Sequence, residues 1–274
     1  ADPRHAELIL EGLSLDKNSK GSPLTGTRDD ETLDDQTPLS EHMATVYRAL
    51  VARAIYLAQD RSDIGFAAKE LSRSMSSPTV SSFEKRKKLG RYFVQHPRVV
   101  LHFHYQQRPL HVTVFSDTDW AGCRKTRKST SGGIILLGSH ILKSHSSTQG
   151  VIALSSGEAG YYGLSKGASV ALGSAGMSAD LGVEFLVNVK TDASAAKGIA
   201  MRIGLGKIRH LETTQLWRQE EVANGIVTIE KVKGTDNPAD AMTKYLSGPS
   251  LAEHCNNLAM SRTNAKQAAG ISTQ

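Results

Sequence analysis

The apolar pattern of the chain changes near Leu110, and this change restricts the folds open to the second half. Three short apolar or alternating runs follow, separated by glycine and serine turns, and they predict three strands in sequence. A glycine-spaced helix comes next, and then a strand, two helices, a strand and a closing helix. The runs are 111–117, 131–138 and 139–146 for the strands, 156–181 for the long helix, and 185–192, 192–202, 212–225, 225–233 and 237–246 for the remainder. This order predicts an α/β fold, a mixed sheet with helices packed on it.

The apolar pattern of the first half differs from that of the second, because its apolar residues recur with helical spacing. Residues 1–41 are predicted to be a polar arm or linker, since their composition is largely polar, acidic and turn-rich. Residues 42–108 contain three helical patterns and a short strand pattern, which predicts a small helical unit. Residues 109–247 are predicted to form the sheet domain, and residues 248–274 a loose tail with little pattern.

Composition limits the class of protein. With 274 residues and 39% hydrophobic residues the chain is long enough to bury a core, and its net charge of +6 suits a polyanionic partner. Two cysteines exclude a disulfide framework and a zinc site of the CxxC kind. No signal peptide and no apolar run near the ~18 residues of a membrane helix are present, so we expect an intracellular protein, cytoplasmic or nuclear, not secreted. Because the first residue is not Met, we also expect a piece of a longer protein or a processed product.

Three acidic residues fall at the ends of predicted elements in the second half. Asp117 ends the first strand, Asp192 ends the fourth, and Asp240 lies at the start of the last helix, after Pro238. Ligand sites in open α/β sheets gather at strand ends, so these carboxylates are expected to converge. Carboxylate oxygens are the ligands that Mg²⁺ prefers, and two such ions can clamp a phosphodiester for hydrolysis. The alternative interpretation is structural, with turn residues at 117 and 192 and a cap-region acid at 240.

The long helix contains an unusual number of glycines. Ser155 or Ser156 is expected to cap its first turn, with Glu158 close behind. Because an interior glycine costs roughly 1 kcal/mol relative to alanine, the glycines at 157, 160, 163 and 167 need a reason. Gly160 is interpreted either as a packing residue or as the place of a lost functional side chain.

The chain contains five ordered segments that resemble the ribonuclease H domain of copia-type LTR retrotransposon Pol polyproteins: FSDTDWAG, LSSGEAGYYGL, VKTDASAAKGIA, GKIRHLE and DNPADAMTKYL. Upstream, YRALVARAIYLAQDRSDIGFAAKELSRSM resembles the segment that links reverse transcriptase to ribonuclease H in that family. The resemblance covers about residues 40–247. It implies a ribonuclease H-like fold, a five-stranded mixed sheet whose first three strands are antiparallel, flanked by helices. It also implies hydrolysis of the RNA strand of an RNA–DNA hybrid with two Mg²⁺ ions (or Mn²⁺) held by four carboxylates.

The matching motifs of this chain contain three of these four acids. The first falls on Asp117, the third on Asp192 and the fourth on Asp240, which the resemblance makes the catalytic and metal-binding residues. The second falls on Gly160, because family members typically read EAEY where this chain reads EAGY. The resemblance therefore implies a site that lacks one carboxylate.

Neither neighbouring acid is expected to replace it. Glu158 lies two residues earlier, about 200° around a helix, so it points to nearly the opposite side. Asp119 shares a strand face with Asp117, but the family carries an acid there in addition to its four. Gly160 is thus interpreted as a lost metal ligand, and reduced or absent hydrolysis is expected.

Two basic stretches are candidates for nucleic-acid contact. The stretch that directly follows the first predicted strand is expected to bind phosphates, with salt-sensitive and sequence-tolerant affinity, through Arg124, Lys125, Arg127 and Lys128. The other stretch, 83–91, is interpreted equally well as a solvated charged face. His210, within GKIRHLE, is expected to have a structural role.

Three functions agree with these observations. The first is an impaired ribonuclease H-type nuclease, the second a catalytically inactive nucleic-acid-binding module, and the third a domesticated structural or interaction subunit. The expected partners are an RNA–DNA hybrid or other nucleic acid, the reverse transcriptase part of the same polyprotein, and a larger assembly. The sequence contains no aromatic-x-Asp-Asp strand of a polymerase centre, so DNA synthesis is not expected.

Overall fold

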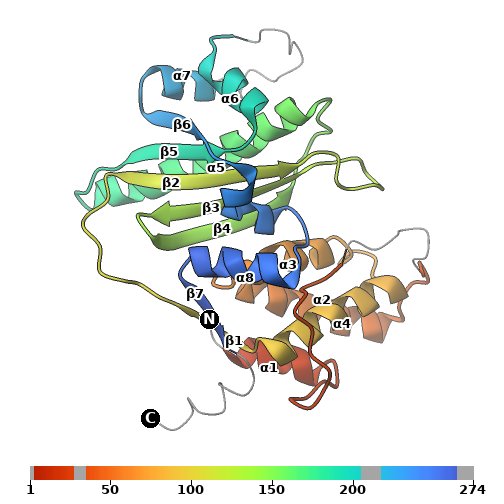
Figure 1. Cartoon of the computed structure of the whole chain (residues 1–274). Coiled ribbons are helices and arrows are strands. Elements are labelled where there is room, and N and C mark those ends of the chain that lie inside the picture. Colours follow the sequence, from red (N-terminus) through yellow and green to blue (C-terminus); the bar gives the residue numbers. More distant parts are fainter. Residues whose placement is uncertain (1–2, 28–34, 205–216, 264–274) are drawn as a thin grey trace. The chain divides into compact units, whose positions relative to one another are not determined.

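The computed structural model describes residues 3–27, 35–204 and 217–263. The chain forms two compact units, residues 1–102 together with 245–274, and residues 103–244. The first unit is mainly helical, and the second contains the large sheet (Figure 1).

A five-stranded mixed sheet forms the centre of the second unit. Its strand order is β4-β3-β2-β5-β6 (Figure 1). Strands β2, β3 and β4 are antiparallel neighbours, whereas β5 runs parallel to β2 and to β6. The bounds are β2 His111–Asp119, β3 Thr130–Leu137, β4 His140–Thr148, β5 Leu186–Thr191 and β6 Val227–Lys231. The predicted ribonuclease H-like α/β fold is confirmed, including its three antiparallel first strands.

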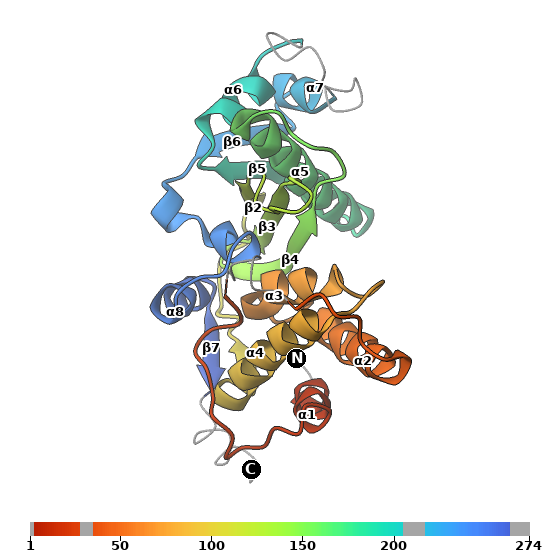
Figure 2. The same cartoon turned by 90° about the vertical axis from the view of Figure 1, so that its right-hand side faces the viewer.

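One face of this sheet is covered by the long helix α5 (Ser156–Asp180), as Figure 2 shows. Its N-cap is Ser155, whose hydroxyl accepts a hydrogen bond from the backbone N–H of Glu158 at 3.2 Å. A Cβ at Gly167 would lie 2.9 Å from Val114 Cγ1, so this glycine lets the helix approach β2 closely. The buried core between them includes Val112, Val114, Tyr161, Leu164, Val187 and Val189. Helix α6 (Ser194–Met201) packs against α5, and α7 (Trp217–Ala223) packs against α6 and β6.

The predicted closing helix, 237–246, is wrong in type and length. The structure has two 3₁₀ segments, η4 (Gly234–Asp236) and η5 (Pro238–Met242). The Asn237 side chain accepts a hydrogen bond from the Ala239 N–H at 3.1 Å, which confirms the predicted start. Thr243 ends η5, because its hydroxyl bonds to the Asp240 carbonyl and to the Asp117 carboxylate. Side-chain bonds of this kind compete with continued helix.

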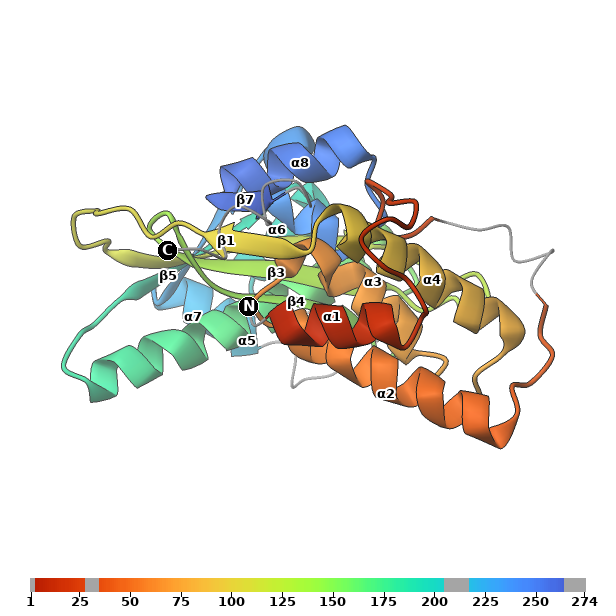
Figure 3. The same cartoon turned by 90° about the horizontal axis from the view of Figure 1, so that it is seen from below.

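In residues 3–27 and 35–97, the described part of the first unit before β1, the chain forms four α-helices. They are α1 Pro3–Glu11, α2 Glu41–Leu57, α3 Gly65–Ser72 after the 3₁₀ turn η2 Ser62–Ile64, and α4 Val80–Gln95. Helix α1 packs against α2 and α4 (Figure 3). The predicted polar arm is therefore wrong for residues 3–11, which form a helix because Ala6 and Ile9 bury one side of it.

The predicted loose tail is wrong for residues 248–263. They form α8 (Gly248–Asn257) and β7 (Met260–Thr263), and β7 pairs antiparallel with β1 (Arg98–Leu101). Leu251 and Cys255 are buried on α8, which holds the helix in place. The partner strand lies far away in the sequence, so local pattern gave no signal for this pairing. Residues 264–274 lie outside the described residues.

A buried ion pair holds the first unit together. The Arg61 guanidinium lies 2.7 Å from the Asp63 carboxylate, and both side chains are almost fully buried. The Tyr92 hydroxyl donates to the same carboxylate at 2.7 Å, and Arg61 also donates to the His96 carbonyl at 3.0 Å. The turn η2 is thereby tied to α4 and to its C-terminal end.

The basic stretch 83–91 is more than a solvated face. Arg86 is buried, and its guanidinium lies 3.6 Å from the centre of the Phe83 ring.

In the described ranges no helix combines the length and the apolar character needed to cross a membrane.

Candidate functional site

Strand β2 places Asp117 on the face of the sheet opposite α5. Thr118 faces α5, since a Cβ at Gly163 of that helix would contact the Thr118 hydroxyl, and adjacent strand residues point to opposite faces. The β3 partner of Asp117 is Gly132, where a Cβ would lie 2.6 Å from Met242 Cβ and 2.7 Å from Thr243 Cγ2. The segment η5 therefore packs directly on β3 next to Asp117, and only glycine at 132 allows this approach.

Two hydrogen bonds hold η5 against β2. The Thr243 hydroxyl donates to Asp117 Oδ2, and the Asn237 side-chain amide donates to the Ser116 carbonyl at 3.1 Å. Asp240 lies between these two anchors in the sequence. The two predicted acids from β2 and η5 are thereby brought to the same place.

The three predicted acids influence one another electrostatically. Burial raises the pKa of Asp117, the nearby Asp240 carboxylate raises it further, and the Thr243 hydrogen bond opposes both effects. Burial also raises the pKa of Asp192, which follows β5, and the Asp117 carboxylate adds to this rise. Asp117 therefore has the other two acids within its electrostatic range.

The carboxylates do not form a closed metal cage by themselves. Throughout the part of the chain that the structure describes, no group of three or more His, Cys, Asp and Glu side chains is gathered at metal-holding distance. Their oxygens are nevertheless the hard donors that suit a divalent cation such as Mg²⁺ or Mn²⁺. The donor set at Asp117, Asp192 and Asp240 fits one such ion in chemistry, while position 160 contributes no donor atom.

Lys244 is a site residue that the sequence reasoning missed. Its ammonium Nζ lies 2.8 Å from Asp240 Oδ2. Burial alone would lower the pKa of Lys244, but Asp240, Asp117 and Asp192 together raise it above its ordinary value. The available signal was the four-residue spacing of Asp240 and Lys244 in a helix-like segment. Lys244 thus supplies a positive charge that faces all three acids.

Gly160 makes a close contact between two helices. A Cβ at this position would lie 3.0 Å from Ala196 Cβ and 3.2 Å from Ala193 Cβ, at the start of α6. Ala193 directly follows Asp192, so position 160 is adjacent to the Asp192 end of the site. Both sequence interpretations of Gly160 therefore have a basis: it packs tightly, and it lies where a fourth acid would border the site.

Neither neighbouring acid points into the site as a replacement. The Glu158 carboxylate is buried, where it accepts hydrogen bonds from the Leu154 N–H at 2.8 Å and from the Tyr162 hydroxyl at 3.1 Å. The Asp119 carboxylate lies over Gly122, where a Cβ would overlap with it. Their environments agree with the expectation that position 160 is not compensated by either residue.

The loop between β2 and β3 presents the basic cluster. Arg124, Lys125 and Arg127 are exposed, and Lys128 is half-buried. A tight turn shapes the loop, with the Arg127 N–H donating to the Cys123 carbonyl at 2.7 Å and Arg127 itself at a φ of +57°. The cluster starts at Arg124, five residues after the end of β2.

The GKIRHLE motif and its His210 lie outside the described residues, within 205–216. The side chain of Trp120 is 47% exposed, and its indole N–H donates to the Ala153 carbonyl at 3.0 Å. Trp120 therefore packs on the loop that precedes α5 and keeps part of its ring accessible.

Comparison with known proteins adds two relatives and a structural neighbour. No protein-family model matches the sequence. The chain is 27% identical over 221 residues to the "Retrovirus-related Pol polyprotein from transposon RE1" of Arabidopsis thaliana, and 28% identical over 206 residues to that from transposon RE2 of the same plant. These matches cover 80% and 74% of this chain, which spans only 15% and 14% of the relatives' own lengths. The solved structure of LC11-RNase H1, isolated from compost, has a TM-score of 0.35 and 18% identity, covering 49% of this chain and 93% of that chain.

Proposed function

Because this chain belongs to the copia-type Pol polyproteins of LTR retrotransposons, and holds their ribonuclease H-like region, we propose that it hydrolyses the RNA strand of RNA–DNA hybrids at a much reduced rate. The observation that carries this proposal is geometric: the Thr243 hydroxyl and the Asn237 amide bond to Asp117 and to the Ser116 carbonyl, which holds the Asp240 segment against β2, and a Cβ at Gly234 just before that segment would lie 3.2 Å from Asp192 Oδ2. We assign the domain to residues 109–247 and a connection-like helical segment to residues 42–108.

Asp117, Asp192 and Asp240 are the residues that would hold a divalent cation, Mg²⁺ or Mn²⁺. When bound, such a cation would neutralise phosphate charge and lower the pKa of a bound water. Thr243 acts as a positioning residue, because its hydroxyl bond fixes the Asp117 carboxylate. Lys244 balances the negative charge of the three acids through its contact with Asp240.

Gly160 is the reason to expect a reduced rate. A fourth carboxylate would contribute oxygen donors on the Asp192 side, and position 160 has none. A site with one donor missing holds its reacting groups less accurately, and a misplacement of ~1 Å can cost about 10²-fold in rate. We therefore expect residual hydrolysis, with the same chemistry and a lower rate.

We assign binding of the RNA–DNA hybrid to the basic loop after β2 as well as to the three acids. Arg124, Lys125, Arg127 and Lys128 lie in the loop that follows β2, where exposed guanidinium and ammonium groups suit phosphate oxygens. The reverse transcriptase part of the same kind of polyprotein, or a larger assembly, is the expected protein partner. We expect the chain to meet its nucleic acid inside the cell, in the cytoplasm or the nucleus.

One observation favours a second candidate, a catalytically inactive nucleic-acid-binding module. A side chain at position 160 would meet Ala196 and Ala193, whose Cβ atoms would lie 3.0 and 3.2 Å from its Cβ, so the structure leaves little room for a fourth acid there. If the chain is such a binding module, the Lys244 charge offsets part of the negative charge of the three acids, and the site does not hydrolyse RNA.

The experiment that separates the two functions measures binding and cleavage in parallel. A hybrid with labelled RNA is incubated with the native chain and with Asp117→Asn, in Mg²⁺ and in Mn²⁺, while its binding is measured in EDTA by fluorescence anisotropy. Slow, metal-dependent cleavage that Asp117→Asn abolishes supports the impaired nuclease. Binding without any cleavage supports the binding module, and the absence of both contradicts the two functions together.

A further inference from the structure

An aromatic ring and two apolar side chains are exposed next to the end of β2. Trp120 directly follows that strand and is 47% exposed. Its indole N–H donates to the Ala153 carbonyl at 3.0 Å, in the loop between β4 and α5. Ile152 and Leu154, on either side of Ala153, are 52% and 69% exposed. Single exposed apolar residues are common on protein surfaces, but a group of them marks an interaction site.

The two loops that carry these side chains are fixed to each other. The buried Ser129 connects them, because its hydroxyl accepts a hydrogen bond from the Ala121 N–H at 3.1 Å and its carbonyl accepts one from the Gln149 N–H at 2.8 Å. The Cys123 sulfur accepts hydrogen bonds from the N–H and the hydroxyl of Thr126, which orders the middle of the β2–β3 loop. The surface is therefore preformed, and little conformational entropy is lost when a ligand binds to it.

The β2–β3 loop, which extends past the end of the sheet in Figure 1, is also positively charged. Arg124, Lys125 and Arg127 are exposed on it. Between Asp119 and Glu158 the sequence contains no acidic residue. The chemistry of this surface thus suits a ligand that combines flat apolar faces with negative charge. Single-stranded nucleic acid has both, because its bases are unpaired and its backbone carries phosphates.

We propose that Trp120 stacks on an unpaired base of a single-stranded nucleic acid whose phosphates contact the β2–β3 loop. This inference rests on the proposed binding of nucleic acid by that loop, and it adds the single strand as a ligand beside the hybrid. Every base has a π face, so binding of this kind tolerates any sequence. The hydrogen bond to Ala153 holds the indole ring in place, and Ile152 and Leu154 offer apolar contact beside it.

The test uses the fluorescence of the two tryptophans of the chain, Trp120 and Trp217. Trp217→Phe leaves Trp120 as the only indole, and a base that stacks on this ring quenches its emission. The chain is titrated in EDTA with an oligothymidylate and with an abasic strand of the same length, which has the phosphates but no bases. Fluorescence anisotropy of labelled strands gives the affinities of the native chain and of Trp120→Leu, Trp120→Phe and Tyr105→Leu. Tyr105→Leu is the matched control, because it removes a ring that is 97% exposed elsewhere in the same unit.

We expect oligothymidylate, but not the abasic strand, to quench Trp120. Trp120→Leu should bind oligothymidylate about fivefold or more weakly than the native chain and should bind the abasic strand equally. Trp120→Phe keeps a stacking face without the N–H donor and should retain most of the affinity, and Tyr105→Leu should retain all of it. Thermal unfolding checks that each variant folds. An unquenched Trp120, or a folded Trp120→Leu chain with native affinity for oligothymidylate, overturns the inference, and a protein-binding surface predicts both results.

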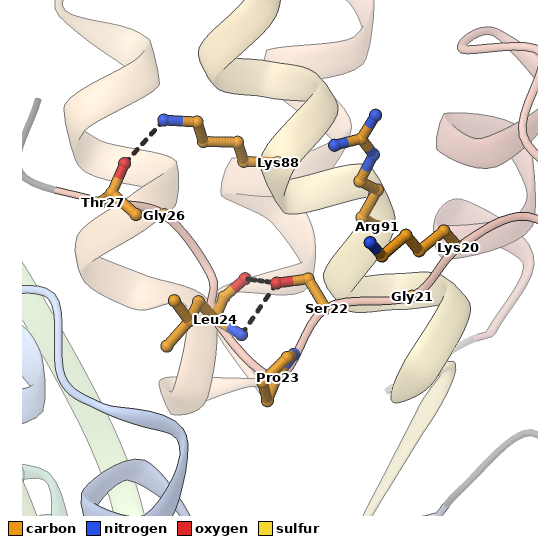
Figure 4. Close-up of a pocket in the computed structure, with 9 residues that line it drawn as sticks. All are labelled: Lys20, Gly21, Ser22, Pro23, Leu24, Gly26, Thr27, Lys88 and Arg91. Atoms are coloured by element: carbon orange, nitrogen blue, oxygen red, sulfur yellow. Dashed lines mark hydrogen bonds between the residues drawn. The ribbon is translucent and has the colours of Figure 1, made fainter.

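A pair of charge variants separates this inference from the proposed function. Lys125→Met/Arg127→Met removes two charges from the loop. The control, Lys20→Met/Arg91→Met, removes two charges from the first unit, where both residues line the pocket in Figure 4. The loop variant should weaken binding of the hybrid and of both strands more than the control does. If it does not, the loop assignment and this inference fail together, whereas weakened binding in the loop variant with no effect of Trp120→Leu overturns this inference alone.

Discussion

The charge of Lys244 is expected to compete with a divalent cation for the three acids. Lys244→Met removes the ammonium group that lies 2.8 Å from Asp240 Oδ2 and leaves an apolar stem of similar length. The acids then lose the positive charge beside Asp240, so an added cation meets a more negative site. We expect the variant to bind Mn²⁺ more tightly than the native chain and to be less stable without metal.

The size of this effect follows from the exposure of the pair. Two opposite charges at about 4 Å interact by ~4 kcal/mol at an effective dielectric constant near 20, but the Lys244 side chain is 47% exposed and water screens it. Exposed ion pairs contribute about 0.2–1 kcal/mol. Because the Asp240 side chain is only 18% exposed, the upper end applies. A difference of ~1 kcal/mol corresponds to about fivefold in Mn²⁺ affinity and to a fall of about 2–4 °C in the metal-free unfolding temperature.

The assay is isothermal titration calorimetry with Mn²⁺ on four chains. Lys244→Arg keeps the charge and should bind Mn²⁺ like the native chain, and Lys143→Met removes an exposed charge on β4 and should also change little. Only Lys244→Met is expected to bind about fivefold more tightly. If it binds Mn²⁺ equally or more weakly, Lys244 does not compete with the cation and the reasoning is refuted.

Three further predictions concern stability. Asp63→Asn should lower the free energy of unfolding by about 3–5 kcal/mol, because it leaves the buried Arg61 charge without its partner; a urea titration measures this. Burial lowers the pKa of His96 from 6.5 to about 4, with Arg262 and Arg61 adding to the effect. Unfolding therefore takes up a proton below pH 6.5, and up to about 3 kcal/mol of stability is lost as the pH falls towards 4; urea midpoints across this range should fall less in a His96→Gln variant. Gly173→Ala should stabilise the chain by up to ~1 kcal/mol, since a Cβ there meets no atom within 4 Å. Gly160→Ala should not stabilise it, because its Cβ would lie 3.0 Å from Ala196 Cβ, and thermal unfolding measures both variants.

Each of these has a clear contrary result. An Asp63→Asn chain as stable as the native chain would mean that the Arg61 charge finds water or another partner. An identical pH dependence in the His96→Gln variant would assign the acid destabilisation to other groups. Equal effects of alanine at 160 and at 173 would show that the Gly160 contact with α6 relaxes without cost.

The sheet was predictable because its signals are local. Alternating residues along β2, glycine and serine turns after each strand, and a serine cap before α5 all act within a few residues of one another. The strand β7 was missed because it pairs with β1, which lies far away in the sequence, and four residues carry no pattern of their own. The closing helix was overestimated because Thr243 is drawn into a hydrogen bond with Asp117, a tertiary contact.

The site was predictable in part for the same reason. Asp192 could be placed from its strand end and Asp240 from its proline-led segment, whereas Asp117 was wrongly predicted to end its strand and lies two residues before the end of β2. The role of Lys244 depends on all three acids lying near it, which only the folded chain establishes. Likewise, the sequence shows that position 160 lacks an acid, but not that Ala196 fills the space beside it.

The missing carboxylate at position 160 is expected to limit hydrolysis. The direct test is the single-turnover cleavage of a hybrid with labelled RNA by Gly160→Glu/Ala196→Gly, in which the second change makes room for the new side chain. The controls are the native chain, Ala196→Gly alone and Gly160→Gln/Ala196→Gly, all checked for folding by thermal unfolding. We expect only the glutamate variant to cut faster, by about 10²-fold or more. A folded glutamate variant that cuts no faster than the native chain would contradict it.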